Sequence, residues 1–454
     1  MSGGILMIIV ISDLHFSDCT VSVNVLPEVF SNILFPQILS KLTTTADKDI
    51  KEIHFVLNGD IFDLVSTDKF LKLPPENRPW NGILDPDYAV NIDTDVVSEY
   101  EKVFDDITKQ PGCNTFINQI HKLNDSLNIP LKISYIIGNH DRVINLYEPL
   151  KQKVKEIFAP VSVEIVNSLH SEKYSLLCRH GHEWDKTCFG YEFARKVLHK
   201  SYDSRFNPEF YKVQNIGEVV TSELMGGIIY RLNYEFQWKG KHDNIIENIK
   251  EINNVRPVHH ALDWLVWTLS QELSQTLKEN IASAIYDSIT AFLNTSLAIS
   301  WDKLTPDLIF SGDIVDRIQL LQKSLKKNDF RSFKSTLKLI KIAEILPEFK
   351  NKIYLKGAIE DFVKFPDLQF VVYGHTHYAK EIVIESTQDD PPKMYINTGT
   401  YLPLIQKATL KGYGIAKKMT ITFIYSKNED NKNKKPQTNS IEFWNGTKQK
   451  EYNK

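Results

Sequence analysis

The sequence lacks most of the features that assign a chain to a membrane or to a disulfide-stabilised secreted scaffold. Its 454 residues include four cysteines, which are widely scattered and form no Cys-x-x-Cys pair. Reduced thiols in a cytoplasmic protein are therefore expected. No apolar run approaches the roughly 20 residues that span a bilayer. The run 5–11 is too short for the apolar part of a signal peptide and has no basic flank, so we interpret it as the first strand.

An excess of charge of one sign is also missing. The net charge is −3, and apolar and charged residues make up 42% and 24% of the chain, which is ordinary for a globular protein. This balance predicts neither a nucleic-acid coat nor a membrane-surface protein. Basic residues do gather at 323–356, and residues 85–106 lean acidic. The length predicts two or more domains.

What the sequence does have is a series of short polar motifs that are rich in metal-binding residues. Each of the first three follows an apolar, β-branched run, at 8–11, 53–57 and 133–137. Their side chains are therefore expected at the carboxyl ends of strands, where open α/β sheets place ligand sites. The six motifs are Asp13-Leu14-His15, Gly59-Asp60-Ile61-Phe62-Asp63, Gly138-Asn139-His140-Asp141, His180-Gly181-His182, Gly374-His375-Thr376-His377 and Asn397-Thr398-Gly399.

The first five motifs supply carboxylate, amide and imidazole groups. This mixture suits a pair of borderline or hard divalent ions better than a structural zinc. Asp13 and His15 are two residues apart, and so are His375 and His377. In extended backbone the members of each pair would face the same side. Asp60 follows Gly59 at a strand exit, and its two carboxylate oxygens can bridge two ions.

The motif set resembles that of the calcineurin-like metallophosphoesterases, a superfamily of two-metal phosphoester hydrolases. The family pattern is Asp-x-His, Gly-Asp-x-x-Asp, Gly-Asn-His-Asp/Glu, a His before Gly, and Gly-His-x-His. All five elements occur here in that order, within residues 5–184 and 366–425. The resemblance implies an α/β fold, a four-layer α/β/β/α sandwich of two mixed sheets with the metals at the strand ends. The motif around Asn397 resembles the family's closing turn, which supports the site.

The resemblance also assigns the metal ligands. The first ion would take Asp13, His15, Asp60 and His377. The second ion would take Asp60, Asn139, His180 and His375. Mn, Fe, Zn and Mg all suit mixed nitrogen and oxygen ligands, with Mn favoured in vitro. A hydroxide that bridges the two ions would attack the phosphorus in line.

Four further residues are expected at the site in other roles. His140 would protonate the leaving oxygen or stabilise its charge. Asp63 would orient His140 or, alternatively, cap the following helix. Arg142 would clamp a phosphate oxygen or, alternatively, form a surface salt bridge. His182 is expected near the substrate or behind the ligands, and the family's His-Gly order makes His180 the preferred ligand.

The chain is predicted to divide into four segments. Residues 1–185 and 365–425 form the two parts of the metallophosphoesterase core, and residues 426–454 form a polar mobile segment and tail. Residues 186–364 form a mainly helical insertion with its own small core, which would act as a lid, a partner-docking element or an oligomerisation element. Within it, apolar residues recur every four positions from Leu265 to Leu293. Such a stripe winds around a straight helix, so the helix either breaks in two or is packed on several sides.

Three local predictions accompany this division. Pro36 must kink or divide a helix over 26–42. A second helix includes residues 116–123, and the long stretch between it and Asp63 is expected to be a functional loop. The segment 311–317 resembles a protein-phosphatase motif, but it is out of order, and Ser311 reads better as the N-cap of a helix.

Metal-dependent hydrolysis of a phosphodiester or phosphomonoester is the leading functional prediction. One alternative is a nuclease that uses the basic stretch 323–356, which could equally be a solvated helix face. A second is a UDP-sugar-lipid or nucleotide pyrophosphatase, because the motif style is similar to that of the UDP-diacylglucosamine pyrophosphatases. That branch has Arg where this chain has His140, and the insertion also departs from it. A third is an effector module whose insertion assembles with partners or with a second copy.

Overall fold

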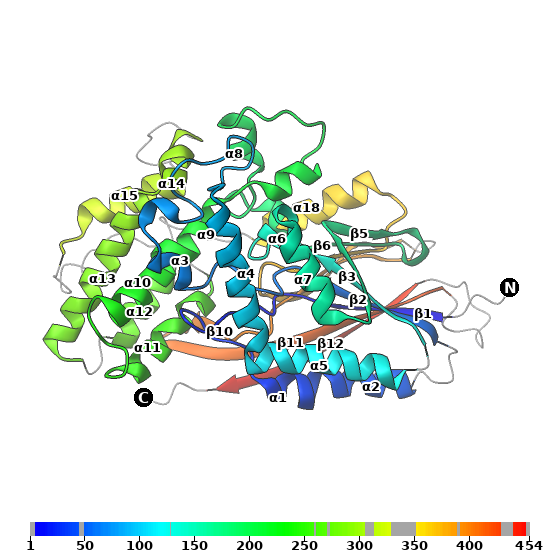
Figure 1. Ribbon diagram of the computed structural model, residues 1–454. Coiled ribbons are helices and arrows are strands. Elements are labelled where there is room, and N and C mark those ends of the chain that lie inside the picture. The colour runs from blue at the N-terminus through cyan, green and yellow to red at the C-terminus, as the bar shows by residue number, and fades with distance from the viewer. Residues whose placement is uncertain are drawn as a thin grey trace.

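The computed structural model describes residues 5–44, 50–127, 129–257, 260–269, 273–304, 313–327, 351–387, 391–427 and 439–450. Within them the chain is α/β, with two mixed sheets and helices packed against both (Figure 1). The predicted fold class and the two mixed sheets are confirmed. In these ranges, no helix combines the length and the apolar character needed to cross a bilayer.

The first sheet is built on the three apolar runs that precede the first motifs. Its strand order is β10-β11-β1-β2-β3-β4, with β12 paired to β11. Strands β1 to β4 are parallel, so the carboxyl ends of β1, β2 and β3 meet at one edge. β11 pairs antiparallel with β1, β10 and β12. The bounds are β1 Ile5–Ile11, β2 Ile50–Asn58, β3 Leu131–Ile136, β4 Ser162–Val166, β10 Leu404–Lys407, β11 Tyr413–Tyr425 and β12 Ser440–Lys450.

The second sheet carries the remaining motifs. Its order is β5-β6-β7-β9-β8, in which β6, β7 and β9 are parallel and the two outer strands are antiparallel. Here too the parallel strands end at one edge. The bounds are β5 Ser168–Ser171, β6 Leu176–Arg179, β7 Phe370–Tyr373, β8 Ala379–Glu385 and β9 Lys393–Thr398.

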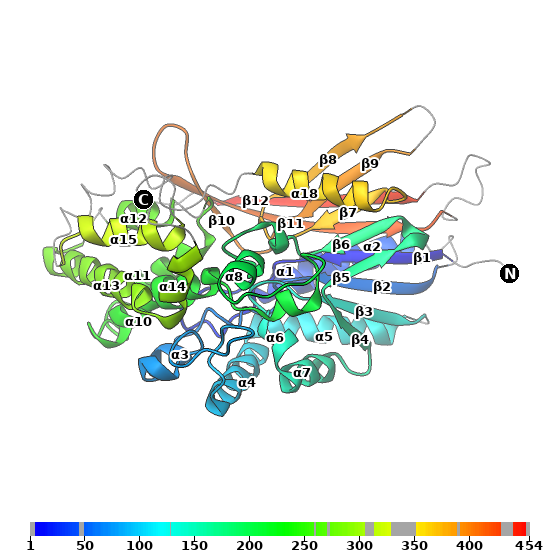
Figure 2. The same ribbon diagram turned by 90° about the horizontal axis from the view of Figure 1, so that it is seen from above.

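Helices of the first part of the chain lie along one side of the first sheet, and α18 (Asn351–Lys364) lies along the second (Figure 2). The insertion contributes a further group of helices at the end of the molecule towards which β1 runs. Helices of the first part are α1 Pro27–Val29, α2 Phe35–Thr44, α3 Lys69–Lys72, α4 Thr94–Lys109, α5 Pro111–Ser126, α6 Val143–Leu146 and α7 Glu148–Phe158. Those of the insertion are α8 Tyr191–Lys196, α9 Ile216–Val219, α10 Gly227–Tyr234, α11 Asp243–Lys250, α12 Ala261–Leu269, α13 Gln275–Leu293, α14 Ser296–Trp301 and α15 Ile314–Ser324.

Short 3₁₀ and π segments complete the helical structure. The π segments are η1 Phe30–Leu34 and η7 Val220–Gly226. The 3₁₀ segments are η3 Pro75–Asn77, η4 Glu172–Tyr174, η5 His182–Trp184, η6 Pro208–Lys212, η8 Glu251–Asn254 and η10 Asp302–Leu304. The first helix is not divided, because α1, η1 and α2 follow one another without a break over 27–44. Pro36 is the second residue of α2, and the widened π turn η1 precedes it, since proline removes an N–H and its ring displaces a carbonyl of the preceding turn.

The alternation of side chains along the strands separates three apolar cores. Ile8 and Val10 of β1 pack with Leu176 and Val372 of the second sheet, so one core lies between the sheets. Residues on the opposite face of β1, such as Ile9, pack against the helices. A third core lies between the second sheet and α18. The helix α18, although inside the predicted insertion, therefore packs on the second sheet.

The insertion differs from the prediction in how its core is built. Its buried side chains, such as Trp264 and Ile285, belong to the same continuous core as Ile9 and Phe16 of the first part. The predicted separate core is therefore not seen among the described residues. The apolar stripe is divided between α12 and α13, and Leu265, Ile281, Ile285 and Ile289 are buried within the chain. The predicted break in that helix is confirmed.

Some local predictions need correction. The stretch expected to be a loop after Asp63 contains α4, whose Val96, Val103 and Ile107 are buried at helical spacing. Strands β5 and β10 were not expected. The prediction of a mobile tail over 426–454 is wrong for 440–450, which form β12 and pair with β11. The N-cap of α15 is Asp313, which forms a capping box with Asp316, and not Ser311. Ser311, residues 328–350 of the basic stretch and residues 428–438 of the predicted tail lie outside the described residues.

Candidate metal centre

Five of the six motifs follow directly on strand ends, which places their side chains in one region. Asp13 follows β1, Asp60 follows β2 and Asn139 follows β3 of the first sheet. His180 follows β6 and His375 follows β7 of the second sheet. Because the two sheets pack face to face around Ile8 and Val372, these two sets of loops meet at one end of the molecule.

The backbone at the candidate ligands is unusual. Asp13, His15, Asp60, His375 and His377 have φ angles of 52°, 46°, 53°, 67° and 60°. Left-handed backbone at residues other than glycine costs on the order of 1–3 kcal/mol and persists where the surroundings enforce it, often at functional sites. The prediction that each pair shares a face through strand alternation is wrong, since these residues lie beyond the strands in left-handed turns.

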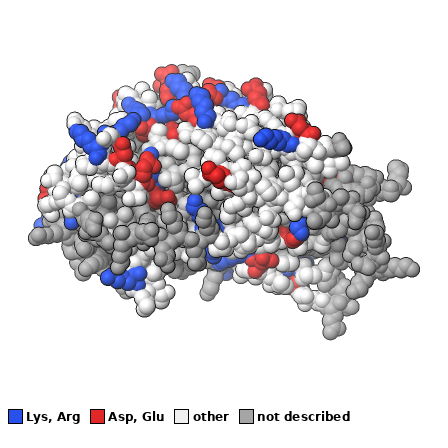
Figure 3. All heavy atoms as spheres, turned by 90° about the horizontal axis from the view of Figure 1, so that it is seen from below, with Lys and Arg blue, Asp and Glu red and all other residues white. Residues whose placement is uncertain are grey.

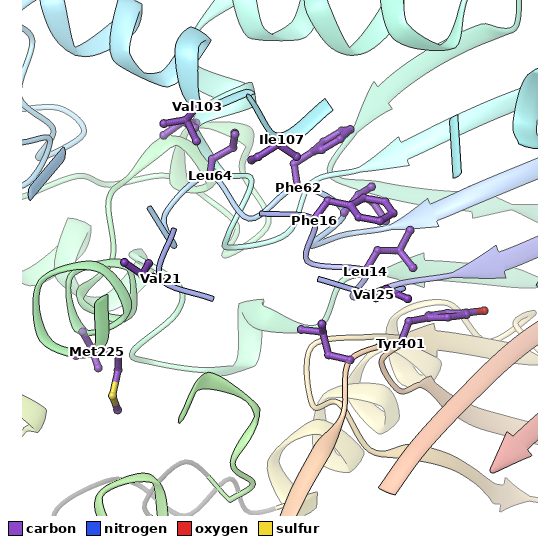
Figure 4. Close-up of a cluster of buried hydrophobic side chains, with 14 of the residues drawn as sticks. Leu14, Phe16, Val21, Val25, Phe62, Leu64, Val103, Ile107, Met225 and Tyr401 are labelled. Atoms are coloured by element: carbon purple, nitrogen blue, oxygen red, sulfur yellow. The ribbon is translucent and has the colours of Figure 1, made fainter. Parts of the chain in front are cut away.

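The ligand-bearing loops are anchored by the apolar residues between their polar ones. Leu14, Phe16, Phe62 and Leu64 point into the buried cluster drawn in Figure 4, where Tyr401 joins them. Backbone hydrogen bonds tie the first two loops together, from Asp13 N to Gly59 O at 3.0 Å, His15 N to Asp60 O at 2.9 Å and Asp63 N to Phe16 O at 2.7 Å. The polar side chains are therefore left on the opposite side of each loop.

The motif glycines make room for the ligands. A Cβ atom on Gly138 would lie 2.2 Å from Asp60 Oδ1, and one on Gly374 would lie 2.5 Å from Asp13 Oδ2. Gly59 has a φ of 85°, which favours glycine, and a Cβ atom added to it would lie 2.3 Å from His180 Nδ1. These three glycines are needed because the ligands approach the backbone closely.

Among the groups of possible ligand atoms in the described residues, two combine residues that were predicted to share an ion. In the first, His377 Nε2 lies 3.0 Å from His15 Nε2 and 3.5 Å from Asp13 Oδ1. In the second, Asp60, His180 and His375 place their ligand atoms within 4.8 Å of one another. Asp60 joins the groups, because its Oδ2 lies 3.0 Å from His180 Nε2 and 3.7 Å from His15 Nε2.

Buried polar atoms without hydrogen-bond partners test whether a cation fits. Asn139 Oδ1 is buried and accepts no hydrogen bond, whereas His180 Nε2 is buried with Asp60 Oδ2 3.0 Å away. Leaving an atom such as Asn139 Oδ1 unpaired costs about 1–3 kcal/mol. An amide oxygen and an imidazole nitrogen aimed into a group of carboxylates are good ligands for a divalent ion. His180 is also held by its other nitrogen, with Nδ1 2.9 Å from Asn58 O.

The electrostatics of the centre favour positive charge. Burial alone would lower the pKa of His180, but the carboxylate of Asp60 raises it to about 10. Burial likewise opposes the rise in the pKa of His15, which Asp13, Asp63 and Asp60 bring to about 10. The pKa of Asp60 is held well below its ordinary value by His180 and His140, against the effect of burial. A pair of bound cations would compensate the negative charge of these carboxylates, as protonated imidazoles do in their absence.

His140 and Asp63 form a pair beside the ligands. His140 Nδ1 lies 2.9 Å from Asp63 Oδ1, and the His140 backbone N–H donates to Asp60 Oδ1 at 2.8 Å. Burial lowers the pKa of His140, but Asp63 and Asp60 more than reverse this, so the pKa is raised. Asp63 Oδ1 also accepts from Ser66 N at 3.0 Å. Asp63 therefore contacts His140, as predicted, and also caps the turn that follows it; the next helix, α3, has Asp68 at its N-cap, so the predicted helix cap at Asp63 is not seen.

The two predicted substrate-binding residues lie outside the cavity lining. Arg142 is buried, and its guanidinium forms a two-pronged ion pair with Glu218 of α9 and donates to Lys212 O at 2.5 Å. It is therefore neither a surface salt bridge nor free to bind a phosphate. His182 is buried behind His180 and His375 and packs against Phe189 and Tyr211. Burial and then the two other imidazoles hold its pKa well below the ordinary value.

Three residues that lie at the site were not predicted from the sequence. Asp185 Oδ2 lies 3.4 Å from His375 Nε2, and Cys188 lies beside them. Arg256, from the insertion, places a guanidinium nitrogen 2.9 Å from His377 Nδ1. Asp185 lies only five residues after His180, so its closeness in sequence to a predicted ligand could have indicated it. No local sequence pattern could have indicated Arg256, which lies in the coil after η8.

The candidate ligands open onto a cavity of about 130 Å³ between the core and the insertion. Its floor includes His15, Asp60, Asn139, His375 and His377. Its opposite wall comes largely from the insertion. The wall residues are Val220, Thr221, Met225, Lys250, Ile252, Asn253, Asn254, Arg256, Pro257 and Ile314. A molecule in this cavity would touch both parts of the chain.

The last motif supports the loops and does not line the cavity. Asn397 Nδ2 donates to Gly374 O at 2.6 Å, and Thr400 Oγ1 donates to Asp13 O at 2.7 Å. Ser12 Oγ and Thr398 Oγ1 lie 2.5 Å apart. The turn after β9 thus links the first loop to the fifth. The chain matches no protein-family model and no curated protein.

Proposed function

We propose that this protein is a two-metal phosphoesterase of the calcineurin-like metallophosphoesterase type, which hydrolyses a phosphodiester or phosphomonoester. The observation that carries the proposal is the position of Asp60, whose Oδ2 lies within 3.7 Å of an imidazole from each group of ligand atoms. A carboxylate shared by two such groups is the arrangement that two-metal hydrolases need, with ions about 3.5–4 Å apart.

The fold proposed with this function is the four-layer α/β/β/α sandwich. Its support is the separation of the cores: helices against the first sheet, sheet against sheet, and α18 against the second sheet. The parallel strands of both sheets end at the candidate centre, as the sandwich requires. Metallophosphoesterase membership itself rests on the motifs and on this arrangement.

The residues that would hold the two ions are those of the two groups. Asp13, His15, Asp60 and His377 would hold the first, and Asp60, Asn139, His180 and His375 the second. When bound, divalent ions would neutralise the phosphoryl charge and activate a water for attack on phosphorus. The buried, unpaired Asn139 Oδ1 and the contact between His180 Nε2 and Asp60 Oδ2 support this assignment.

His140 is the residue proposed to act on the leaving group. Its imidazole lines the cavity, and Asp63 holds it through Nδ1. Because Asp63 holds Nδ1, Nε2 is the nitrogen that would donate a proton or offer positive charge to the leaving oxygen. A positioned acid of this kind contributes about 10²–10⁴-fold to a reaction rate.

The first test is Mn²⁺-dependent hydrolysis of bis-p-nitrophenyl phosphate beside the mono-nitrophenyl ester. We expect turnover that Asp60→Asn abolishes and that His140→Ala reduces roughly 10²–10⁴-fold. The exposed Asp87→Asn is the matched control and should retain full activity. A diester preference would direct the search to diesters, and a monoester preference to small phosphates or phosphoproteins. Turnover that survives Asp60→Asn would contradict the proposal.

The alternative functions gain less support from the described residues. The nuclease depends on the stretch 323–356, of which 328–350 lie outside the described residues. Among the described residues on the face drawn in Figure 3, basic and acidic side chains are interspersed, without the single-sign track that a phosphate backbone favours. Much of the apolar stripe proposed for oligomerisation is buried within the chain.

A further inference from the structure

We propose that Arg256 of the insertion is the anion-binding residue of the cavity and holds a phosphate oxygen of the substrate. This inference rests on the proposed phosphoesterase function and adds a substrate contact to it. It gives to Arg256 the role that the sequence analysis expected of Arg142. It also makes the insertion a part of the substrate site.

Arg256 is fixed in place by its backbone and by one side of its guanidinium. Its N–H donates to Ile405 O at 2.8 Å, and the neighbouring Val255 bridges to Ile405. One guanidinium nitrogen, Nη1, donates to Asn253 O at 2.6 Å and to Val255 O at 3.0 Å. The other, Nη2, lies 2.9 Å from His377 Nδ1, and both residues line the cavity. The group is therefore pre-positioned beside a candidate metal ligand.

The charge of Arg256 is not matched by a carboxylate. The buried arginines Arg142, Arg179 and Arg78 each have one, in Glu218, Asp361 and Glu223. Arg256 is half-buried, and no ion pair within 4.0 Å joins it to a carboxylate of a described residue. A partly desolvated guanidinium without an anion beside it favours an anionic ligand.

Metal binding would increase this need for an anion. An imidazole that gives one nitrogen to a metal carries a proton on the other, and a guanidinium has only N–H donors. Nη2 of Arg256 would then face no acceptor on His377. A phosphate oxygen supplies the missing acceptor, and arginine pairs with phosphate through charge-assisted, often two-pronged hydrogen bonds. The carboxylates of the floor would hold the cations, and the arginine of the wall would hold the anion.

The test is a calorimetric titration with inorganic phosphate, in the metal-free and in the Mn²⁺-loaded full-length protein. The variants are Arg256→Gln and Arg256→Lys, with Arg195→Gln as the control, because Arg195 is exposed and outside the cavity. Mn²⁺ affinity and the thermal unfolding midpoint are measured on the same samples. We expect Arg256→Gln to weaken phosphate binding roughly 10- to 100-fold, Arg256→Lys to weaken it less, and Arg195→Gln to leave it unchanged.

The outcomes separate this inference from the proposed function. Equal phosphate affinity in wild type and Arg256→Gln, or no phosphate binding by wild type in either state, would overturn it even if Mn²⁺ binds. A fall in Mn²⁺ affinity without a fall in phosphate affinity would also overturn it, because Arg256 would then only position His377. Absence of Mn²⁺ binding by wild type would count against the proposed function, and the metal-free titrations would still decide on Arg256.

Discussion

At the scale of single residues, the candidate centre depends on backbone that ordinary side chains avoid. Five of the predicted ligands, Asp13, His15, Asp60, His375 and His377, have positive φ angles. The sequence indicated which side chains would lie together, because the residue types and the order of the motifs could be recognised. It could not indicate the left-handed turns, because Asp and His tolerate them only under the constraint of distant contacts.

The close approach of glycine to the ligands gives a residue-scale prediction. In Gly138→Ala, the new Cβ would lie 2.2 Å from Asp60 Oδ1 and must displace the carboxylate that joins the two groups. We expect Mn²⁺ affinity to fall about 10-fold, the lower end for a displaced supporting contact. Calorimetric titration measures this. Gly414→Ala is the control, because an added Cβ there meets nothing within 4 Å. Equal loss in both variants would contradict the account.

At the scale of elements, the apolar runs before the motifs predicted β1, β2 and β3 closely. Their residues are buried on both faces, so the runs are nearly continuous and easy to recognise. The short strands β5 and β10 have four residues each, too few for a clear alternation. The helix α4 was hidden by its polar face, although Val96, Val103 and Ile107 marked the buried one.

The pairing of β2 with β3 contains a histidine whose titration should affect stability. His54 Nε2 lies 2.8 Å from Ser134 Oγ, and burial, with Lys132, lowers its pKa to about 4. In the unfolded chain the pKa is near 6.5. The neutral imidazole therefore stabilises the fold above pH 6.5, and this contribution is lost as the pH falls through about 4.

The corresponding measurement is chemical denaturation of the wild type and His54→Gln from pH 8 to pH 4. We expect the free energy of unfolding of the wild type to decrease more steeply below pH 6.5 than that of the variant. The exposed His170→Gln is the control and should follow the wild type. Parallel curves for wild type and His54→Gln would show that His54 does not titrate in this way.

At the scale of the whole molecule, the insertion is joined to the core by a continuous apolar cluster and by buried ion pairs. Arg142 follows the third motif and pairs with Glu218 of the insertion, while Arg78 pairs with Glu223. The sequence showed that a helical insertion enters between His180 and His375. It could not show that the insertion shares the core, because the partners are distant in sequence.

Because the core and the insertion share an apolar cluster and buried ion pairs, we predict that they unfold together. Glu218→Gln would leave the buried guanidinium of Arg142 without its carboxylate, at a cost of about 3–5 kcal/mol. We expect one thermal transition, shifted to lower temperature, in circular dichroism and calorimetry. Glu235→Gln is the control, because Glu235 is exposed and lies 3.8 Å from Arg231, a contact that should matter by less than about 1 kcal/mol. Two separate transitions in the wild type would contradict the shared core.

The central claim is that the five motif loops create a site for two neighbouring divalent ions. Titration of the metal-free protein with Mn²⁺, followed by calorimetry and electron paramagnetic resonance, tests it most directly. We predict two ions per chain in the wild type, with a spectrum of spin-coupled Mn²⁺, and loss of the coupled signal in Asp60→Asn. A single ion per chain, no tight binding, or a coupled signal that survives Asp60→Asn would contradict the account.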